Sequence, residues 1–205
     1  MNPKDGITYY NRGNAYHQLG DHKQAIRDLD KSIELRPTDA KAFTVRGGAY
    51  TALRDYERAV GDYGKAIELD PKYYPAYGSR GVAFQEMGDY QRAIADFEKM
   101  IALQPDKAAG YYVLARFYVS AKDRKFRNGK LAIKYAKKAV ELDREDPSRT
   151  AVLAAAYAEA GRFKDAIATQ TEAIVILKRK NQIDAEDLKK YERDLNLYRR
   201  NKALP

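Results

Sequence analysis

A sequence motif recurs every 34 residues through the first half of the chain. Each copy has a glycine followed by a small residue and an aromatic residue, and later by an alanine and a proline at constant distances. The aligned segments are NRGNAYHQLGDHKQAI, VRGGAYTALRDYERAV and SRGVAFQEMGDYQRAI. A fixed period of this length is the signature of a repeat architecture, in which each small unit buries its apolar face against its neighbours.

Each repeated unit is predicted to contain two helices. Tyr9, Gly13 and Tyr16 recur at spacings of four and three, which place them on one face of a helix. Gly20 interrupts this pattern, and apolar residues at helical spacing resume after it. Pro37 then follows, and because proline cannot continue a helix it ends the second one. The unit is therefore a helix-turn-helix.

This pattern resembles the tetratricopeptide repeat (TPR) family. The resemblance implies an all-α fold, a right-handed α-solenoid of helix-turn-helix repeats, and we expect a single domain over residues 1–205. It would contain five repeats, the fourth carrying an insertion at 122–130, followed by a C-terminal capping helix. The expected repeat boundaries are about 6–39, 40–73, 74–107, 108–146 and 147–180, with the capping helix at 184–200.

The predicted capping helix begins at Asp184, with Ile183 and Leu188 placed as an apolar pair across its first turn. An apolar stripe runs along one face and charged residues occupy the other. The stripe consists of Leu188, Tyr191, Leu195 and Tyr198. A helix with one polar face is what the end of a repeat array needs.

Composition limits the function classes. The chain has no cysteine and no apolar run long enough to span a membrane, so we expect neither disulfides nor thiolate metal sites. Its two histidines, His17 and His22, are five residues apart and therefore not on one helical face. We predict a protein that is not an enzyme, without cofactor or metal. A cytoplasmic location is expected, with the periplasm as the alternative if a leader was removed.

A set of opposite charges repeats with the motif. An arginine in the first helix and an aspartate in the second occur together in the first three units, and both are absent from the last two. The predicted ion pairs are Arg12–Asp28, Arg46–Asp62 and Arg80–Asp96. The two members of each pair should lie at similar height on facing helices, so we interpret them as structural pairs and not as an arginine comb for an anionic ligand.

The resemblance also implies a ligand-binding surface, because TPR proteins hold peptides on the concave face formed by their first helices. The residues placed there by repeat phase are Tyr10, Asn14, His17, Thr44, Gly48, Val82, Gln85, Tyr112 and Arg116, with Thr51, Gly78, Val119, Ala151 and Ala155 beside them. This surface is nearly uncharged and should have gaps at its glycines. We expect a protein or peptide partner held through side-chain pockets.

One partner class of the family is not expected. Its chaperone-binding members hold a terminal carboxylate with a set of lysine, asparagine and arginine side chains. The matching places carry Tyr10, Asn14, Val45, Pro75 and Ser79, and only the asparagine fits. A carboxylate tail of the Hsp70/Hsp90 type is therefore not expected as a ligand. The asparagine ladder of sugar-transferase relatives is also missing.

The net charge of +9 is concentrated in the second half of the chain. Residues 122–144 contain nine basic and three acidic residues. Such a patch attracts nucleic acid or an anionic surface, which is the first alternative function. We do not favour it, because only Phe126 in the patch offers a ring for base stacking. The second alternative is an accessory region of a larger enzyme.

The insertion at 122–130 is predicted to be a loop at the tip of the fourth hairpin. Phe126 should tuck back against the hairpin, and Asn128-Gly129 should form the turn before the next helix. The loop would then project a positive knob, and a role in recognition and a role in closing the hairpin remain open. The knob consists of Lys122, Arg124, Lys125 and Arg127.

Overall fold

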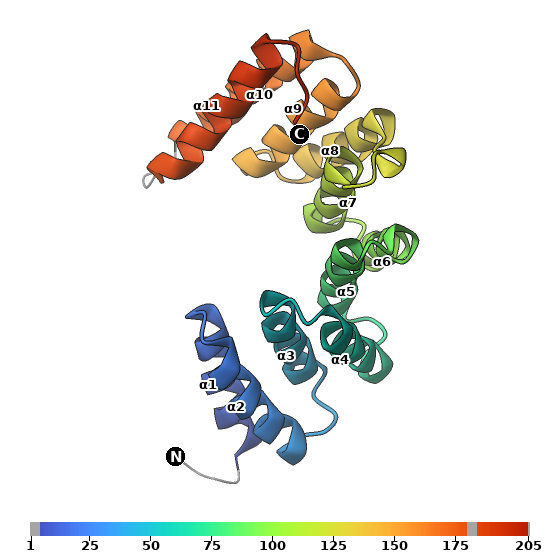
Figure 1. The fold of residues 1–205 in the computed structure, drawn as a ribbon, viewed down its shortest axis with the longest axis vertical. Helices are drawn as coiled ribbons and strands as arrows, with labels where there is room; N and C mark the ends of the chain where they lie inside the picture. The colour runs from blue at the N-terminus through green and yellow to red at the C-terminus, as the bar shows by residue number, and fades with distance from the viewer. Residues whose placement is uncertain (1–4, 180–183, 205) are drawn as a thin grey trace. The chain divides into compact units, whose positions relative to one another are not determined.

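The computed structural model describes residues 5–179 and 184–204, which form α-helices and one short 3-10 helix, with no strand among them. Figure 1 shows that successive helices form antiparallel hairpins. The chain divides into two compact units, residues 1–103 and 104–205. Each unit is described separately.

The first unit contains three helical hairpins, and the helices of each hairpin make its most extensive contacts. The helices are α1 (Gly6–Gln18), α2 (His22–Leu35), α3 (Ala40–Ala52), α4 (Tyr56–Leu69), α5 (Tyr74–Met87) and α6 (Tyr90–Leu103). Successive hairpins are joined through contacts of α2 with α3 and of α4 with α5. The first helices also meet, α1 with α3 and α3 with α5, so that they form one layer and the second helices another.

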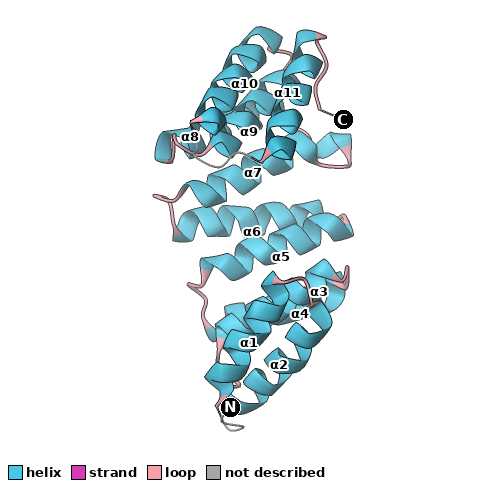
Figure 2. Cartoon of the chain, turned by 90° about the vertical axis from the view of Figure 1, so that its left-hand side faces the viewer, coloured by secondary structure: helices cyan, strands magenta, loops and turns pink. Residues whose placement is uncertain are grey.

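The second unit contains two hairpins and a final helix (Figure 2). Its elements are α7 (Ala108–Ser120), the 3-10 helix η1 (Arg124–Phe126), α8 (Gly129–Leu142), α9 (Pro147–Glu159), α10 (Phe163–Lys178) and α11 (Ala185–Arg199). Helix α9 packs against α7, α8 and α10, and α11 packs against α10. No helix in the described parts of the chain is both long and apolar enough to cross a membrane.

Helix ends follow from local sequence. The carboxylates of Asp21 and Asp55 accept hydrogen bonds from backbone N–H groups in the first turns of α2 and α4, which have no partner within the helix. Gly20 and Gly88 end their helices with φ values of 83° and 82°. At the same repeat phase Arg54 adopts φ 61°, a conformation that costs a residue with a Cβ atom free energy.

The contact between the two helices of a hairpin explains the repeating glycine of the motif. A Cβ atom at Gly47 would lie 2.7 Å from the ring of Tyr63, and one at Gly81 would lie 2.5 Å from the ring of Phe97. The glycines therefore admit the largest buried side chains of the second helices. Alanines one turn before these side chains, Ala59 among them, are completely buried.

Helix α11 covers the end of the second unit with its apolar stripe. Tyr191 and Leu195 form a buried cluster with Ile174 and Leu177 of α10, and Leu188 packs against it. Tyr198 is 1% exposed. Asp184 caps the helix by accepting a hydrogen bond from the N–H of Glu186 at 2.9 Å. The apolar partner expected for Leu188, Ile183, lies outside the described residues, as does the expected repeat boundary at 180.

Candidate binding face

The first unit presents one face of three neighbouring helices. On each of α1, α3 and α5, residues at spacings of four and three point to the same side. We call this surface the first-helix face, and it consists of Tyr10, Asn14, His17, Thr44, Gly48, Thr51, Gly78, Val82 and Gln85. All nine residues are half-buried. They are thus held by the fold while part of each remains accessible to another molecule.

The polar groups of this face differ in what they offer. The hydroxyls of Thr44 and Thr51 donate to the carbonyl oxygens of Ala40 and Gly47 in their own helices, both at 2.9 Å. The Thr51 oxygen also lies 3.0 Å from the Tyr63 hydroxyl, so only Thr44 presents mainly oxygen lone pairs. Within the described residues, the side-chain amides of Asn14 and Gln85 have no hydrogen-bond partner. An amide supplies both donors and acceptors. The middle of the face therefore suits the polar backbone of an extended segment.

The gaps expected at the glycines of the face are filled, which corrects the sequence-based expectation. A Cβ atom at Gly48 would lie 3.1 Å from Nε2 of His17, and one at Gly78 would lie 3.0 Å from the sulfur of Met100. The imidazole comes from α1 and the thioether from α6, so neighbouring helices occupy the space that each missing side chain leaves. The glycines thus permit close packing and do not form open pockets.

Three residues gather at one end of the face, and sequence reasoning identified only Tyr10 among them. Burial raises the pKa of Tyr10, and the nearby charge of Asp39 raises it further. Burial also raises the pKa of Tyr73, with smaller contributions from Tyr10, Tyr74 and Asp39. The start of α3 links these groups, because α3 contacts both α1 and α5. Asp39 and Tyr73 are the N-cap residues of α3 and α5. Their position directly before the first helix of a repeat could have been read from the sequence.

A hollow of about 260 Å³ adjoins this end of the face. Asp39, Asp70 and Tyr73 line it together with the cations Arg36 and Lys41. Arg36 pairs with Asp39 across 2.9 Å, so opposite charges balance one another within it. This end of the face therefore offers a ligand a recess and the side chains of Tyr10 and Tyr73.

The expected surface also included residues of the second unit. Arg116 is exposed on α7, and its guanidinium lies 5.7 Å from the centre of the Tyr112 ring. Ala151 is half-buried. Val119 and Ala155 are each 5% exposed, so these two residues belong to the core and offer little to a ligand. In the second unit only Tyr112, Arg116 and Ala151 remain as candidates.

Each of the three arginines on the first helices of the first unit faces the aspartate sixteen residues later. Nε and Nη2 of the arginine donate to the two carboxylate oxygens, which is a bidentate arrangement. The Nη2–Oδ1 distances are 2.6 Å for Arg12–Asp28, 2.7 Å for Arg46–Asp62 and 2.8 Å for Arg80–Asp96. The aspartates are 5–7% exposed, so these arginines hold buried carboxylates and do not form a comb for an anionic ligand.

Arg46 makes one further contact, which reaches a neighbouring hairpin. Its Nη1 donates to Asp30 of the preceding hairpin at 2.6 Å, which links two repeats through one guanidinium. Burial alone would lower the pKa of Arg46, but the hydrogen bonds and charges of Asp62 and Asp30 raise it above its ordinary value. The place of Asp30 in the next hairpin is occupied by Gly64, and a Cβ atom there would lie 3.9 Å from Nη1 of Arg80.

Replacing Gly64 with aspartate should therefore create the missing link between the second and third hairpins. A carboxylate at this position reaches Nη1 of Arg80, and Gly64→Asp should stabilise the first unit by about 1 kcal/mol at low salt. Gly64→Asn is the matched control, since it has the same size and no charge. Urea unfolding at low and high salt measures the difference, which should shrink as salt screens the pair. Equal stability of the two variants at low salt would contradict the link.

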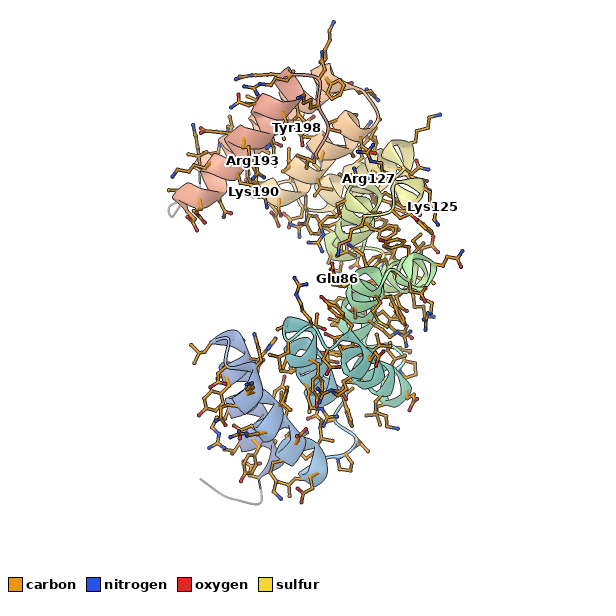
Figure 3. The ribbon with its side chains drawn as sticks, viewed as in Figure 1. Glu86, Lys125, Arg127, Lys190, Arg193 and Tyr198 are labelled. Atoms are coloured by element: carbon orange, nitrogen blue, oxygen red, sulfur yellow. The ribbon has the colours of Figure 1, made fainter. Side chains whose placement is uncertain are left out.

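The basic patch of the second unit is only partly exposed. Arg127 does not project, contrary to expectation: its Nε donates to the carbonyl oxygen of Ala121 at 2.9 Å, and its side chain is 13% exposed (Figure 3). Lys122, Arg124 and Lys125 are exposed, and Lys125 pairs with Asp123 at 2.9 Å. The carbonyl groups that a loop leaves unpaired explain the inward turn of the Arg127 guanidinium.

The loop itself contains η1, with Phe126 half-buried. The side chain of Asn128 accepts a hydrogen bond from the N–H of Leu131 at 3.0 Å and so caps α8. Gly129 is already the first residue of that helix. The Asn-Gly pair thus starts a helix, where a turn was expected.

The two histidines are close together, although their sequence spacing predicted otherwise. The chain reverses at Gly20, so that His17 at the end of α1 faces His22 at the start of α2. Their Nδ1 atoms are 3.1 Å apart. The five-residue spacing excluded a shared face of one helix, but it did not take into account that the turn between two helices brings the rings together.

Helical hairpins repeat through both units, and in the first unit a glycine of each first helix lies against a large side chain of the second. This arrangement defines an α-helical repeat protein. The Tetratricopeptide repeat family model matches residues 7–39, 40–73 and 74–107. The chain belongs to the tetratricopeptide repeat family. No curated protein matched the sequence.

Solved structures of other repeat proteins share the fold. The chain is similar to MamA from Desulfovibrio magneticus RS-1, with 23% identity and a TM-score of 0.70 over 86% of this chain and 97% of that one. It is similar to TTC0263, a thermophilic TPR protein from Thermus thermophilus, with 17% identity and a TM-score of 0.74 over 94% and 100%. A shorter likeness, 25% identity and a TM-score of 0.53 over 57% and 92%, is to the first TPR of Spaghetti (RPAP3) bound to the HSP90 peptide SRMEEVD.

Proposed function

We propose that this protein is a non-catalytic scaffold that holds a peptide or protein segment on the first-helix face of residues 5–103. The observation that carries the proposal is the pair of half-buried amides, Asn14 and Gln85, which have no hydrogen-bond partner among the described residues. Such an amide bonds to water in the free chain, and a partner with matching polar groups replaces that water.

The shape and charge of the face agree with this role. Tyr10 and Tyr73 gather at one end beside the hollow, and tyrosine provides a large contact area with a polar tip. None of the nine face residues carries a carboxylate, lysine or arginine. The peptide of the RPAP3 complex contains several acidic residues, and this face lacks the cations that an acidic tail would need. We therefore propose a segment of low net charge as the ligand.

The basic patch is the weaker candidate for the binding surface. Arg127 donates to the backbone, while Lys125 and Lys138 pair with Asp123 and Glu141. Phe126 is half-buried, so only part of its ring is accessible for stacking on a base. A polyanion would have to displace these internal pairs before it could use Lys125, Arg127 or Lys138.

Replacing Val82 with arginine should weaken peptide binding, because Val82 lies between Gly78 and Gln85 on α5 and a long side chain there would block that part of the face. The probe is a peptide selected against the full chain from a phage-displayed random library. Isothermal titration should show a loss of affinity of about tenfold or more for Val82→Arg and for Val82→Glu, since both block the face whatever their charge.

The matched control is Gly61→Arg on α4, where nothing lies within 4 Å of an added Cβ atom and the residue is exposed. This variant should bind the peptide as the original chain does. Circular dichroism checks that all variants keep their helices. Selected peptides that bind Val82→Arg and Val82→Glu as tightly as the original chain would contradict the proposed face.

A further inference from the structure

The turn of the first hairpin brings together the only two histidines of the sequence. His17 lies in the last turn of α1, and His22 is the first residue of α2. Between them Gly20 adopts φ 83°, which reverses the chain. The ring centres are 5.1 Å apart with the planes tilted by 53°, and the Nδ1 atoms face each other at 3.1 Å. The pair is therefore positioned by two helix ends and not by a flexible loop.

The distance between the two nitrogens suits a shared metal ion. Imidazole nitrogens bind zinc at about 2.0–2.1 Å, so two of them at adjacent coordination positions lie roughly 2.9–3.4 Å apart. The observed separation of 3.1 Å falls within this range. Without an ion, one neutral ring donates its Nδ1–H to the lone pair of the other. An ion bound to both nitrogens takes the place of this proton.

The surroundings hold His17 in place. Its Nε2 lies 3.1 Å from the position of a Cβ atom at Gly48, so the absence of a side chain at Gly48 gives the ring its space against α3.

No third ligand from the described residues joins the two histidines. Oδ1 of Asp21, between the two histidines in sequence, accepts a hydrogen bond from the N–H of Gln24 at 3.1 Å. Over residues 5–179 and 184–204, no three or more histidine, cysteine, aspartate or glutamate residues cluster to hold a metal ion. The chain thus supplies two ligands at this turn, and the other coordination positions would be filled by water or by a partner.

We propose that His17 and His22 form a two-ligand site for a transition-metal ion that prefers imidazole, such as Zn²⁺, Ni²⁺ or Cu²⁺. The site lies at the end of the first-helix face, because His17 belongs to that face and contacts the Gly48 position. The proposed metal binding does not depend on whether a peptide binds the first-helix face. Imidazole ligands suit these three ions, whereas Mg²⁺ and Ca²⁺ require oxygen ligands and should not bind.

The test uses the full chain without a histidine tag, titrated with Ni²⁺ or Zn²⁺ alone. Isothermal titration should show one ion per chain, and the imidazole proton resonances of both histidines should shift or broaden together in NMR spectra. His17→Gln and His22→Gln should each lower the affinity by at least about tenfold, because each variant leaves a single ligand. Mg²⁺ at the same concentration should leave both resonances unchanged.

Gly48→Ala provides a second variant in which both histidines remain. Its Cβ atom displaces the His17 ring, and it should weaken metal binding while peptide binding and helix content are measured separately. Absence of saturable binding up to about 1 mM ion would overturn the proposal. So would an affinity that only one of the two histidine substitutions reduces, since that result places the ion elsewhere.

Discussion

Asp62→Ala should destabilise the first unit by about 3 kcal/mol, measured as the free energy of unfolding in urea. Asp62 is 7% exposed, and its two oxygens receive Nε and Nη2 of Arg46 at 2.8 Å and 2.7 Å. Without this carboxylate, two donor groups of a guanidinium that is 19% exposed lose their partner. Asp30 continues to pair with Nη1, which keeps the expected cost at the lower end of the range for buried pairs.

Removing both charges together should cost much less. In the last two repeats the arginine place holds leucine, and the aspartate place holds tyrosine or threonine. The double variant Arg46→Leu/Asp62→Thr reproduces the combination of Leu153 and Thr169. A double-mutant cycle over Arg46→Leu, Asp62→Thr and the double variant isolates the coupling. Single variants whose effects simply add would contradict the pairing.

The other two pairs provide a graded comparison. The side chain of Arg80 is 24% exposed and that of Arg12 is 39% exposed, against 19% for Arg46. Because water solvates an exposed guanidinium when its partner is removed, Asp96→Ala should cost less than Asp62→Ala, and Asp28→Ala least. This order links burial directly to the free energy of unfolding.

Much of the fold could be predicted because the repeat supplies the same information several times. The 34-residue period predicted the hairpins, and the joint presence and absence of arginine and aspartate predicted a contact between α1 and α2. The link from Arg46 to Asp30 could not be predicted in this way, because Gly64 occupies the equivalent place and the contact does not recur.

The contacts on the first-helix face were harder to anticipate because they join different helices. Whether a glycine leaves a gap depends on the side chain opposite it, and the ring of His17 and the sulfur of Met100 come from other helices. The closeness of His17 and His22 likewise depends on the path of the turn at Gly20. Helical spacing within one element contains none of this information.

One regularity was present in the sequence and could have been used. Gly13, Gly47 and Gly81 face large side chains sixteen residues later. Where the later repeats replace the glycine with Ala115 or Ala154, the residue at the facing phase is Ala136 or Gln170 in place of leucine, tyrosine or phenylalanine. Volume added to the first helix is accompanied by a change in the second, as close packing requires.

The same packing argument predicts that adding a single methyl group destabilises the protein most at Gly129. A Cβ atom there would lie 2.7 Å from the backbone nitrogen of Ala160 and 2.8 Å from its Cα. At Gly81 the obstacle is a ring, which can tilt, but at Gly129 it is the backbone at the end of α9. The start of α8 and the end of α9 must then move apart.

Gly129→Ala should therefore destabilise the second unit by about 2–3 kcal/mol, although alanine favours a helix more than glycine does. Gly61→Ala is the matched control: it also lies in a helix, nothing is within 4 Å of the added atom, and it should stabilise the chain by about 0.5–1 kcal/mol. Urea unfolding followed by circular dichroism measures both. The two variants add the same methyl group, so opposite changes in the free energy of unfolding isolate the contact with Ala160. If both variants were more stable than the original chain, the start of α8 could move away from α9 at little cost, which would contradict the prediction.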